Sequence, residues 1–281
     1  MSVWFVTGAS RGLGLAITKE ALSRGHQVAA TARDITAIAA AFPDADKALL
    51  TLPLDVTNQA QITAAVNAAT NRFGRIDVLV NNAGRGLLSA VEEASDAEVR
   101  SIFDINVFGL LAVTKAALPV LRQQQSGHVI NISSSAGFTS RPGWGIYAST
   151  KFAVEAVSEA LSEEVKALGI KVSIIEPGGF RTDFQDASSI HVAHDTIIDY
   201  ENGPVGAVRR NLVNTNHNQP GDPAKAARAI VDITENSEPP LRLVLGPEVV
   251  ERFRNKIAAF SQNLADWENV SASTNFGEEE R

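Results

Sequence analysis

Cysteine is absent from the 281 residues of this sequence. Without it the chain cannot form disulfides, thiolate-ligated metal centres or a cysteine nucleophile. Basic residues are also outnumbered, since 25 Lys and Arg stand against 32 Asp and Glu, which gives a formal net charge of −7 and a pI of about 5.3. We therefore expect no general binding to nucleic acid or to an anionic membrane, although a local basic pocket for a phosphate is compatible with this charge.

A targeting signal and long apolar runs are missing as well. The sequence begins MSVWFVTGAS, where no basic segment precedes a long apolar run, and no stretch of about 18 uninterrupted apolar residues follows. We accordingly expect a cytoplasmic protein with no membrane partner. The pair His191 and His194 lacks a nearby third ligand, so we expect a solvated loop there and no metal site.

What the chain does contain is an alternation of short apolar runs with longer stretches of helical periodicity. Such an alternation is typical of successive βα units whose parallel sheet is covered on both faces. Strands are predicted at Ser2–Thr7, Gln27–Ala32, Ala48–Pro53, Ile76–Asn81, His128–Ser133, Lys171–Glu176 and Leu241–Leu245. Helices are predicted at Gly14–Arg24, Gln59–Phe73, Asp96–Gln124, Ala148–Leu168, Pro223–Glu235 and Glu248–Trp267. The predicted fold class is therefore α/β, with seven strands in one doubly wound sheet.

A single main domain is expected, because 44% of the residues are hydrophobic and no repeat or low-complexity linker divides the chain. We assign residues 1–250 to this domain, and residues 251–281 to a C-terminal helix with an acidic tail. The segment Asp183–Gly221 is rich in Asn, Asp, His and Gly. We expect it to be a long loop that roofs the substrate pocket and is mobile without ligand.

The stretch VTGASRGLG, Val6 to Gly14, follows the first predicted strand and opens the first predicted helix. Glycines in that place permit a sharp turn and let backbone N–H groups approach a pyrophosphate at the positive end of a helix. The spacing Gly8-x-x-x-Gly12-x-Gly14 differs from the usual G-x-G-x-x-G, and a strand-to-helix turn without any ligand also needs glycines. The context favours a dinucleotide site.

The end of the second predicted strand, AATARD, bears on the choice of cofactor. An acidic residue there would accept hydrogen bonds from a ribose 2′-hydroxyl, whereas an arginine would pair with a 2′-phosphate. Ala32 stands where the acid is expected, Arg33 follows it, and Arg11 in the glycine turn adds a second cation. This pattern favours NADP over NAD. In the alternative interpretation both arginines are ordinary surface charges and Asp34 binds the ribose.

The stretch YASTK places Tyr147 and Lys151 four residues apart at the start of a helical pattern. Side chains at i and i+4 lie on one face of a helix, so a phenol and an ammonium can reach a shared point. We expect the ammonium to lower the pKa of the phenol towards the range of a general acid or base. In isolation such a pair is more often a packed ring beside a solvated amine.

These motifs occur together in an order that closely resembles the short-chain dehydrogenase/reductase family, over essentially residues 2–250. The resemblance covers Thr7 and the glycine turn, LDV at 54–56, NNAG at 81–84, INISSSAG at 130–137, YASTK at 147–151 and PGGFRT at 177–182. Two departures, Leu13 in place of the commoner isoleucine and the chain beyond residue 250, do not touch the chemistry. The resemblance implies a Rossmann-type sheet with strand order 3-2-1-4-5-6-7.

The resemblance also implies catalytic roles. Tyr147 would exchange a proton with the substrate oxygen, Lys151 would depress the pKa of Tyr147 and hold ribose hydroxyls, and Ser134 would bind the substrate oxygen. Ser134 is selected among three consecutive serines because the family's serine lies thirteen residues before the tyrosine. Asn106, in FDINVFG, would hold a water that links Lys151 to solvent, although an Asn can equally bond the backbone.

Cofactor binding is implied for a larger set of residues along the carboxyl ends of the strands. They are Gly8, Ser10, Arg11, Gly12, Leu13, Gly14, Arg33, Asp55, Val56, Asn82, Ala83, Gly84, Tyr147, Lys151, Pro177, Gly178 and Thr182. The expected function is NADP(H)-dependent reduction of a small, moderately apolar ketone or aldehyde, or the reverse oxidation. Trp144 and Phe180 are expected in the substrate pocket, whereas Trp4 and Phe5 are expected in the core.

Two other functions stay open at this point. One is an NAD-linked hydroxysteroid or polyol dehydrogenase, and the other is a non-catalytic protein that senses NADP(H). The intact set of catalytic residues counts against the sensor. The resemblance further implies a homodimer or homotetramer that assembles through the long helices predicted at Asp96–Gln124 and Ala148–Leu168.

Overall fold

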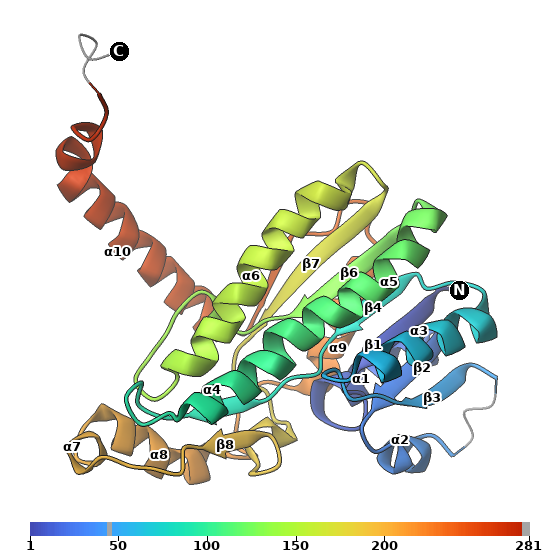
Figure 1. Cartoon of the computed structure of the whole chain (residues 1–281), viewed down its shortest axis with the longest axis horizontal. Helices are drawn as coiled ribbons and strands as arrows, with labels where there is room; N and C mark the ends of the chain where they lie inside the picture. The colour runs from blue at the N-terminus through green and yellow to red at the C-terminus, as the bar shows by residue number, and fades with distance from the viewer. Residues whose placement is uncertain (44–46, 277–281) are drawn as a thin grey trace.

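A seven-stranded parallel sheet forms the centre of the protein (Figure 1), seen in a computed structural model that describes residues 1–43 and 47–276. Its strands follow the order β3-β2-β1-β4-β6-β7-β9. The predicted order is confirmed, because β5 and β8 are short extra strands that pair only with each other. The strands are β1 Val3–Thr7, β2 Gln27–Ala32, β3 Leu49–Pro53, β4 Val78–Asn81, β5 Gly86–Leu88, β6 Gly127–Ile132, β7 Ile170–Pro177, β8 Ile190–Val192 and β9 Arg242–Leu245.

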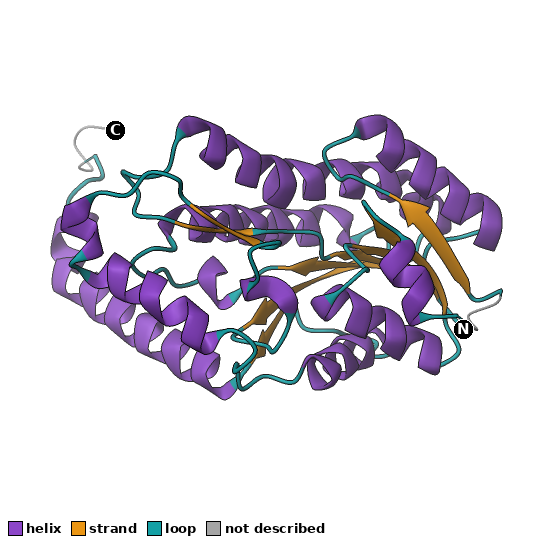
Figure 2. Ribbon diagram, turned by 90° about the horizontal axis from the view of Figure 1, so that it is seen from below, coloured by secondary structure: helices purple, strands orange, loops and turns teal. Residues whose placement is uncertain are grey.

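Helices cover both faces of this sheet, as Figure 2 shows from a second direction. On one face α3 Gln59–Phe73, α5 Leu110–Gln124 and α6 Gly145–Lys166 enclose one apolar core. On the other face α1 Gly12–Ser23, α2 Thr36–Ala41 and α9 Pro223–Thr234 enclose a second core. The strands between them are apolar on both sides for this reason: Phe5 of β1 joins the first core, whereas its neighbour Trp4 joins the second.

Local sequence signals explain several helix ends. The Asn58 side chain accepts a hydrogen bond from the backbone N–H of Gln61 at the start of α3, and Gly74 ends that helix in the left-handed region with φ of 80°. Helix α9 begins with Asp222 as the capping residue and Pro223 at the first helical position, as the sequence predicts. Such ends fix where each strand-to-helix turn lies, and therefore where the side chains at the carboxyl edge of the sheet meet.

The predicted single helix Asp96–Gln124 is three consecutive pieces: α4 Asp96–Phe103, a π-helical segment η1 Asp104–Gly109, and α5. By length, composition and a mean hydropathy of 1.5 this stretch could cross a membrane, but 44% of its most apolar window is buried inside the fold. One helix of this kind is weak support for a membrane span, because the core helix of a globular domain has the same properties.

The prediction of one irregular loop over Asp183–Gly221 was wrong. This segment contains the short helix η3 Asp183–Gln185, β8, the helix α7 Ile198–Glu201 and the helix α8 Pro204–Thr215. Helix α8 forms because Pro204 starts it and because Val205, Val208 and Leu212 follow a helical spacing on its inner side. Strand β8 pairs in parallel with β5. We refer to residues 183–221 as the lid segment.

The C-terminal helix α10 spans Pro247–Ala272, which is longer than predicted, and stands clear of the body along most of its length (Figure 1). Its first turns lie beside β9 and the end of β7. Residues 277–281 of the predicted acidic tail lie outside the described residues.

Candidate active site

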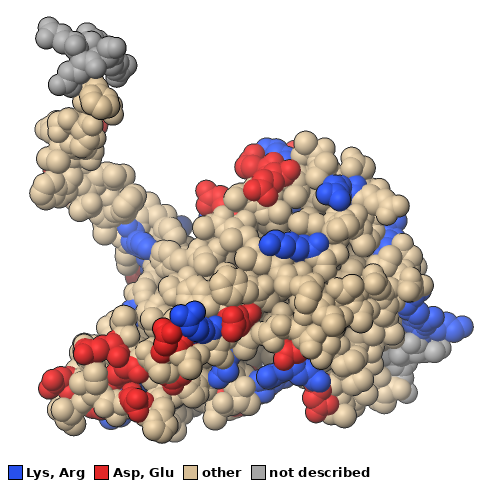
Figure 3. All heavy atoms as spheres, viewed as in Figure 1, with Lys and Arg blue, Asp and Glu red and all other residues tan. Residues whose placement is uncertain are grey.

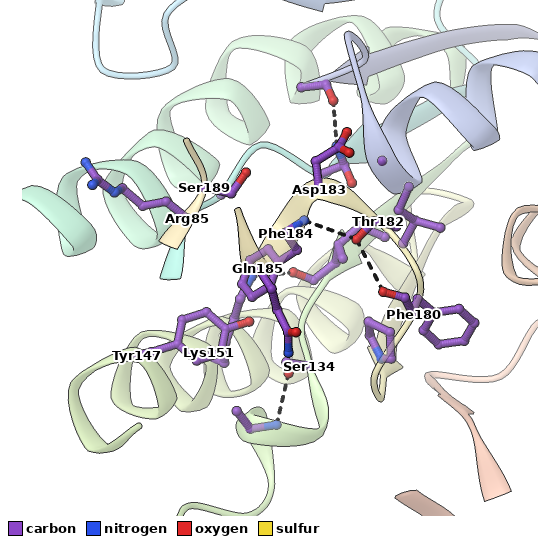
Figure 4. A pocket seen from close by; sticks show the side chains of 18 of the residues that line it. Arg85, Ser134, Tyr147, Lys151, Phe180, Thr182, Asp183, Phe184, Gln185 and Ser189 are labelled. Atoms are coloured by element: carbon purple, nitrogen blue, oxygen red, sulfur yellow. Dashed lines mark hydrogen bonds between the residues drawn. The ribbon is translucent and has the colours of Figure 1, made fainter. Parts of the chain in front are cut away.

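A cavity of about 1170 Å³ opens at the carboxyl ends of the parallel strands, under the lid segment (Figure 4). It is larger than the roughly 300–1,000 Å³ usual for a ligand pocket, so a dinucleotide and a substrate can share it. All but two of the residues that the sequence proposes for the site lie in its wall. The two exceptions are Gly14 and Asn106, which contact residues of the wall from the protein interior. The residues in the wall are Gly8, Ser10, Arg11, Gly12, Leu13, Arg33, Asp55, Val56, Asn82, Ala83, Gly84, Ser134, Tyr147, Lys151, Pro177, Gly178 and Thr182.

The glycine turn is shaped by close backbone contacts. Gly8 has a φ of +66°, and a Cβ atom there would come within 3.0 Å of the Ala83 Cα. A Cβ on Gly14 would collide with the carbonyl oxygen of Gly8. Gly14 is therefore required for the first turn of α1 to pack under the loop, which explains why it does not reach the cavity wall.

Asn82 and Thr7 hold this turn against the end of β4. The Asn82 Nδ2 donates hydrogen bonds to the carbonyl oxygens of Thr7 at 2.9 Å and Gly8 at 3.0 Å. In return the Thr7 hydroxyl oxygen accepts from the backbone N–H groups of Asn82 at 2.9 Å and Ala83 at 3.0 Å. The turns after β1 and β4 are thereby held as one rigid floor.

At the outer end of the cavity Arg33 lies in the wall, whereas Asp34 does not. The Asp34 carboxylate accepts hydrogen bonds from the backbone N–H of Thr36 at 2.9 Å and from its hydroxyl at 2.7 Å, and both bonds hold the pKa of Asp34 below its ordinary value. Arg11 donates to the hydroxyl of Ser188 at 2.6 Å and to its carbonyl at 3.0 Å. Arg11 thus ties the glycine turn to the lid segment.

Tyr147 and Lys151 both lie on the first turns of α6 and face the cavity (Figure 4). Burial raises the pKa of Tyr147 to about 12, while the neighbouring Ser134 hydroxyl acts in the opposite direction. Burial also lowers the pKa of Lys151 to about 8. The net pKa of Tyr147 therefore lies above its ordinary value, because the loss of solvent outweighs the lowering that the sequence predicts.

Lys151 is held at the edge of β6. Its Nζ donates a hydrogen bond to the carbonyl oxygen of Ile132 at 2.8 Å and lies 5.9 Å from the centre of the Tyr147 ring. This contact fixes the long side chain, so that the ammonium stays beside the Tyr147 ring in the cavity wall.

Ser134 begins the short helix η2, Ser135–Gly137, and its hydroxyl oxygen accepts from the backbone N–H of Ala136 at 3.1 Å. Of the three consecutive serines it is the one whose hydroxyl acts on Tyr147. Ser135 instead accepts a hydrogen bond from Arg252 of α10 at 3.2 Å. Ser133 is buried and lies toward Glu155 of α6.

Asn106 lies in the π-helical segment η1 and is buried. Its Oδ1 accepts from the backbone N–H of Arg85 at 2.9 Å, and its Nδ2 donates to the Arg85 carbonyl at 2.9 Å and to the Thr150 hydroxyl at 3.0 Å. Both amide hydrogens are used in this way. The side chain therefore joins the chain after β4 to helix α6, next to Lys151, and positions the catalytic helix.

A buried carboxyl pair, Glu155 of α6 and Glu176 of β7, lies behind the catalytic residues and was missed by the sequence analysis. Burial, with a further contribution from Glu155, raises the pKa of Glu176 to about 7. Arg242 of β9 donates to Glu155 at 3.1 Å. Their positions carried a signal, since Glu155 follows Lys151 by one helical turn and Glu176 directly precedes the PGG turn.

The inner half of the cavity is aromatic. The Trp144 ring meets Tyr147 edge-on at 5.6 Å and 70°, and the Phe184 ring lies 5.8 Å from Tyr147. Phe180 also lies in the wall, together with Leu212 of the lid segment. Phe184 was missed, because a single aromatic residue within a polar segment gives no signal in the sequence. This half of the cavity suits an apolar group beside the reacting carbon.

His191 and His194 lie in the lid segment near the Glu98 carboxylate. The His191 Nε2 lies 2.7 Å from Glu98 Oε1, and the backbone N–H of His194 donates to the same oxygen at 3.1 Å. Glu98 also completes the capping box with Ser95 at the start of α4. These contacts tie the lid segment to the body.

Known proteins resemble this chain in sequence and in structure, and the matches point to one family. The family model described as short chain dehydrogenase matches residues 2–192. The chain is 38% identical to the oxidoreductase BOA17 of Botryotinia fuckeliana over 275 residues, covering 97% of this chain and 98% of that protein. A crystal structure of a short-chain dehydrogenase from Streptomyces avermitilis is 40% identical, with a TM-score of 0.88 over 98% of this chain and all of that one.

Nicotinamide cofactors occur in structural relatives. A serine dehydrogenase complexed with NADP+ is 28% identical, with a TM-score of 0.74 over 87% of this chain and 94% of that one. Other similar structures hold NAD or NADP.

Proposed function

The chain belongs to the short-chain dehydrogenase/reductase family, and from that premise we propose that it uses NADP(H) to reduce a moderately apolar ketone or aldehyde to the alcohol. The observation that carries this proposal is the meeting of Ser134, Tyr147 and Lys151 in one cavity between the glycine turn and an aromatic wall. The reverse oxidation uses the same groups.

The cofactor fits the residues present. The floor made by the glycine turn and Asn82 offers backbone N–H groups at the start of α1 for the pyrophosphate. The preference for NADP is supported by Arg33, which lies in the wall and is suited to a 2′-phosphate. Asp34, which would favour NAD, is outside the wall and already bonded to Thr36.

The bound cofactor supplies hydride, and the protein supplies a proton and orientation. The carbonyl oxygen, which would become negatively charged as its carbon accepted hydride, would take the phenolic proton of Tyr147. A phenol with a pKa of about 12 keeps its proton at neutral pH until this base forms. The Ser134 hydroxyl stabilises the charge that develops on the oxygen. Lys151, with a pKa of about 8, is largely protonated at pH 7 and stabilises the resulting phenolate.

The test is a turnover screen with NADPH against a panel of ketones and aldehydes that differ in size and polarity. Consumption of NADPH with an aromatic or branched apolar ketone, and little with a charged sugar, supports the proposal. NADH-only turnover would move the assignment to an NAD-linked dehydrogenase. Tight NADPH binding without turnover on any carbonyl or alcohol would favour a sensor.

We also propose a cytoplasmic location and assembly into a homodimer or homotetramer through the helical surfaces of residues 96–124 and 148–168. Exposed apolar side chains on these stretches support the assembly, among them Phe108 and Phe152. Light scattering of the purified protein tests it.

A further inference from the structure

The outer half of α10 carries an apolar stripe that nothing in the described protein covers. Ile257, Phe260, Leu264 and Trp267 have exposed fractions of 56%, 61%, 55% and 59%. They follow each other at spacings of three, four and three residues, which places them on one side of the helix. We refer to these four residues as the α10 stripe. The part of the helix that bears them projects away from the body (Figure 1).

The same stripe begins inside the protein. Phe253, one helical turn before Ile257, is buried and packs on the Phe138 ring at 4.6 Å. Lys256 lies 4.8 Å from the centre of the Phe138 ring and 4.9 Å from that of Phe152. The base of α10 is therefore fixed on the body, and the direction of its free half is set by this anchor.

A free helix of this length needs a partner. Residues 257–272 are all exposed, and a single helix of about 12–15 residues is marginal in water even with an Ala-rich sequence. This one also contains Ser, Asn and Asp, which are weaker helix formers than Ala. Burying the four large apolar side chains of the stripe against a second surface would stabilise this half of the helix.

The charged residues along α10 indicate which kind of partner surface the stripe contacts. The turn just before the stripe carries Arg252, Arg254 and Lys256, after Glu248 and Glu251 at the start of the helix, whereas the free half carries only Asp266 and Glu268. On the face shown in Figure 3 the projecting part of the helix is largely uncharged. A helix that lies on an anionic membrane carries Lys and Arg on its polar face, and the free half has neither. A second α10 in the opposite direction would bring the acidic end of its free half, at Glu268, to the basic turn around Lys256.

We propose that the free half of α10 pairs antiparallel with the same segment of a second copy of this chain. In a register centred on residue 262, Ile257 faces Trp267 of the second copy, and Phe260 faces Leu264. Lys256 and Glu268 then lie at the same level. Each apolar pair combines a larger side chain with a smaller one, as interdigitated layers require. This contact is separate from the proposed assembly through residues 96–124 and 148–168.

The association is expected to be weak. A pair of helices with about four turns each buries less than the roughly 1,200 Å² of a typical stable interface, so we expect a Kd in the micromolar range or above. A covalent trap is therefore the appropriate measurement, and the absence of cysteine means that one introduced thiol gives no background.

The experiment compares two single-cysteine variants of the full chain under mild oxidation. In the proposed register Asn263 flanks the two-fold axis on the stripe side, whereas Gln262 lies on the outer side of the helix. Asn263→Cys is expected to form a disulfide-linked dimer at least tenfold faster than Gln262→Cys. Adding Phe260→Asp to Asn263→Cys should remove this advantage, and circular dichroism with NADPH binding reports whether the body is intact.

Equal rates for the two thiols, or a rate for Asn263→Cys that Phe260→Asp does not change, would overturn the proposal. Faster self-linking of Leu264→Cys than of Asn263→Cys would also overturn it, because a parallel pair brings identical stripe positions together. Co-sedimentation with phosphatidylserine vesicles that depends on Phe260 would instead assign the stripe to a membrane.

Discussion

Arg33 gives the sharpest prediction about cofactor choice. The side chain lies in the cavity wall at the end of β2, where a 2′-phosphate is expected, and Arg11 is already engaged with Ser188. A hydrogen bond to a charged group contributes about 1.5–3 kcal/mol, and the exposed position of Arg33 favours the lower end of this range. Each 1.4 kcal/mol corresponds to a factor of ten. Arg33→Ala should therefore lower kcat/KM for NADPH by about tenfold.

The assay is a comparison of kcat/KM for NADPH and NADH with one carbonyl substrate. The kcat/KM for NADH should stay within about twofold, because NADH has no 2′-phosphate for Arg33 to bind. Arg122→Ala, at an exposed arginine of α5 outside the cavity wall, is the matched control and should change neither value. Equal losses for both cofactors, or no loss for NADPH, would refute the assignment of Arg33.

Three further predictions concern the framework of the site. Gly14→Ala should weaken NADPH binding and lower the melting temperature, because the added Cβ meets the Gly8 carbonyl; Gly25→Ala, where nothing lies within 4 Å, should leave NADPH binding unchanged in a titration. Arg209→Met removes the partner of the buried Glu93 carboxylate and should weaken the lid segment by about 3–5 kcal/mol. Limited proteolysis within residues 183–221 should then be faster than in Arg210→Met, whose side chain is exposed, and equal rates would contradict a role for the Glu93 pair. Because the folded-state pKa of Glu176 is raised from 4.5 to about 7, its protonated form stabilises the fold at low pH, and this contribution is lost as pH rises from about 4.5 to 7. In Glu176→Gln the free energy of unfolding, measured by denaturant titration, should fall less between pH 4.5 and 7 than in the original protein. The same pH dependence in both proteins would show that Glu176 is ionised at neutral pH.

The cofactor half of the site was predictable from sequence because its signals are local. Gly8 is favoured by its positive φ and Gly14 by its close contact with the Gly8 carbonyl. Both stand at a strand-to-helix turn whose place follows from the apolar pattern. Tyr147 and Lys151 share a face because they are one helical turn apart. The strand order followed from the family resemblance.

The lid segment and the pKa values were less predictable because both depend on distant contacts. Helix α8 is specified by Val205, Val208 and Leu212, which are only apolar positions among many polar ones until β5 and α6 supply a surface for them. The pKa of Tyr147 depends on its burial, and Phe184 of the lid segment, far away in the sequence, packs near its ring. This contact is not visible in the spacing of YASTK.

The central claim is that the phenol of Tyr147 exchanges the proton while the nucleotide held beside it exchanges hydride. Its most direct test is Tyr147→Phe, measured both as NADPH affinity by fluorescence titration and as kcat with the best carbonyl substrate. General acid catalysis contributes about 10²–10⁴-fold, so kcat should fall by at least two orders of magnitude while NADPH affinity stays within about threefold. A kcat within tenfold of the original protein would contradict the account.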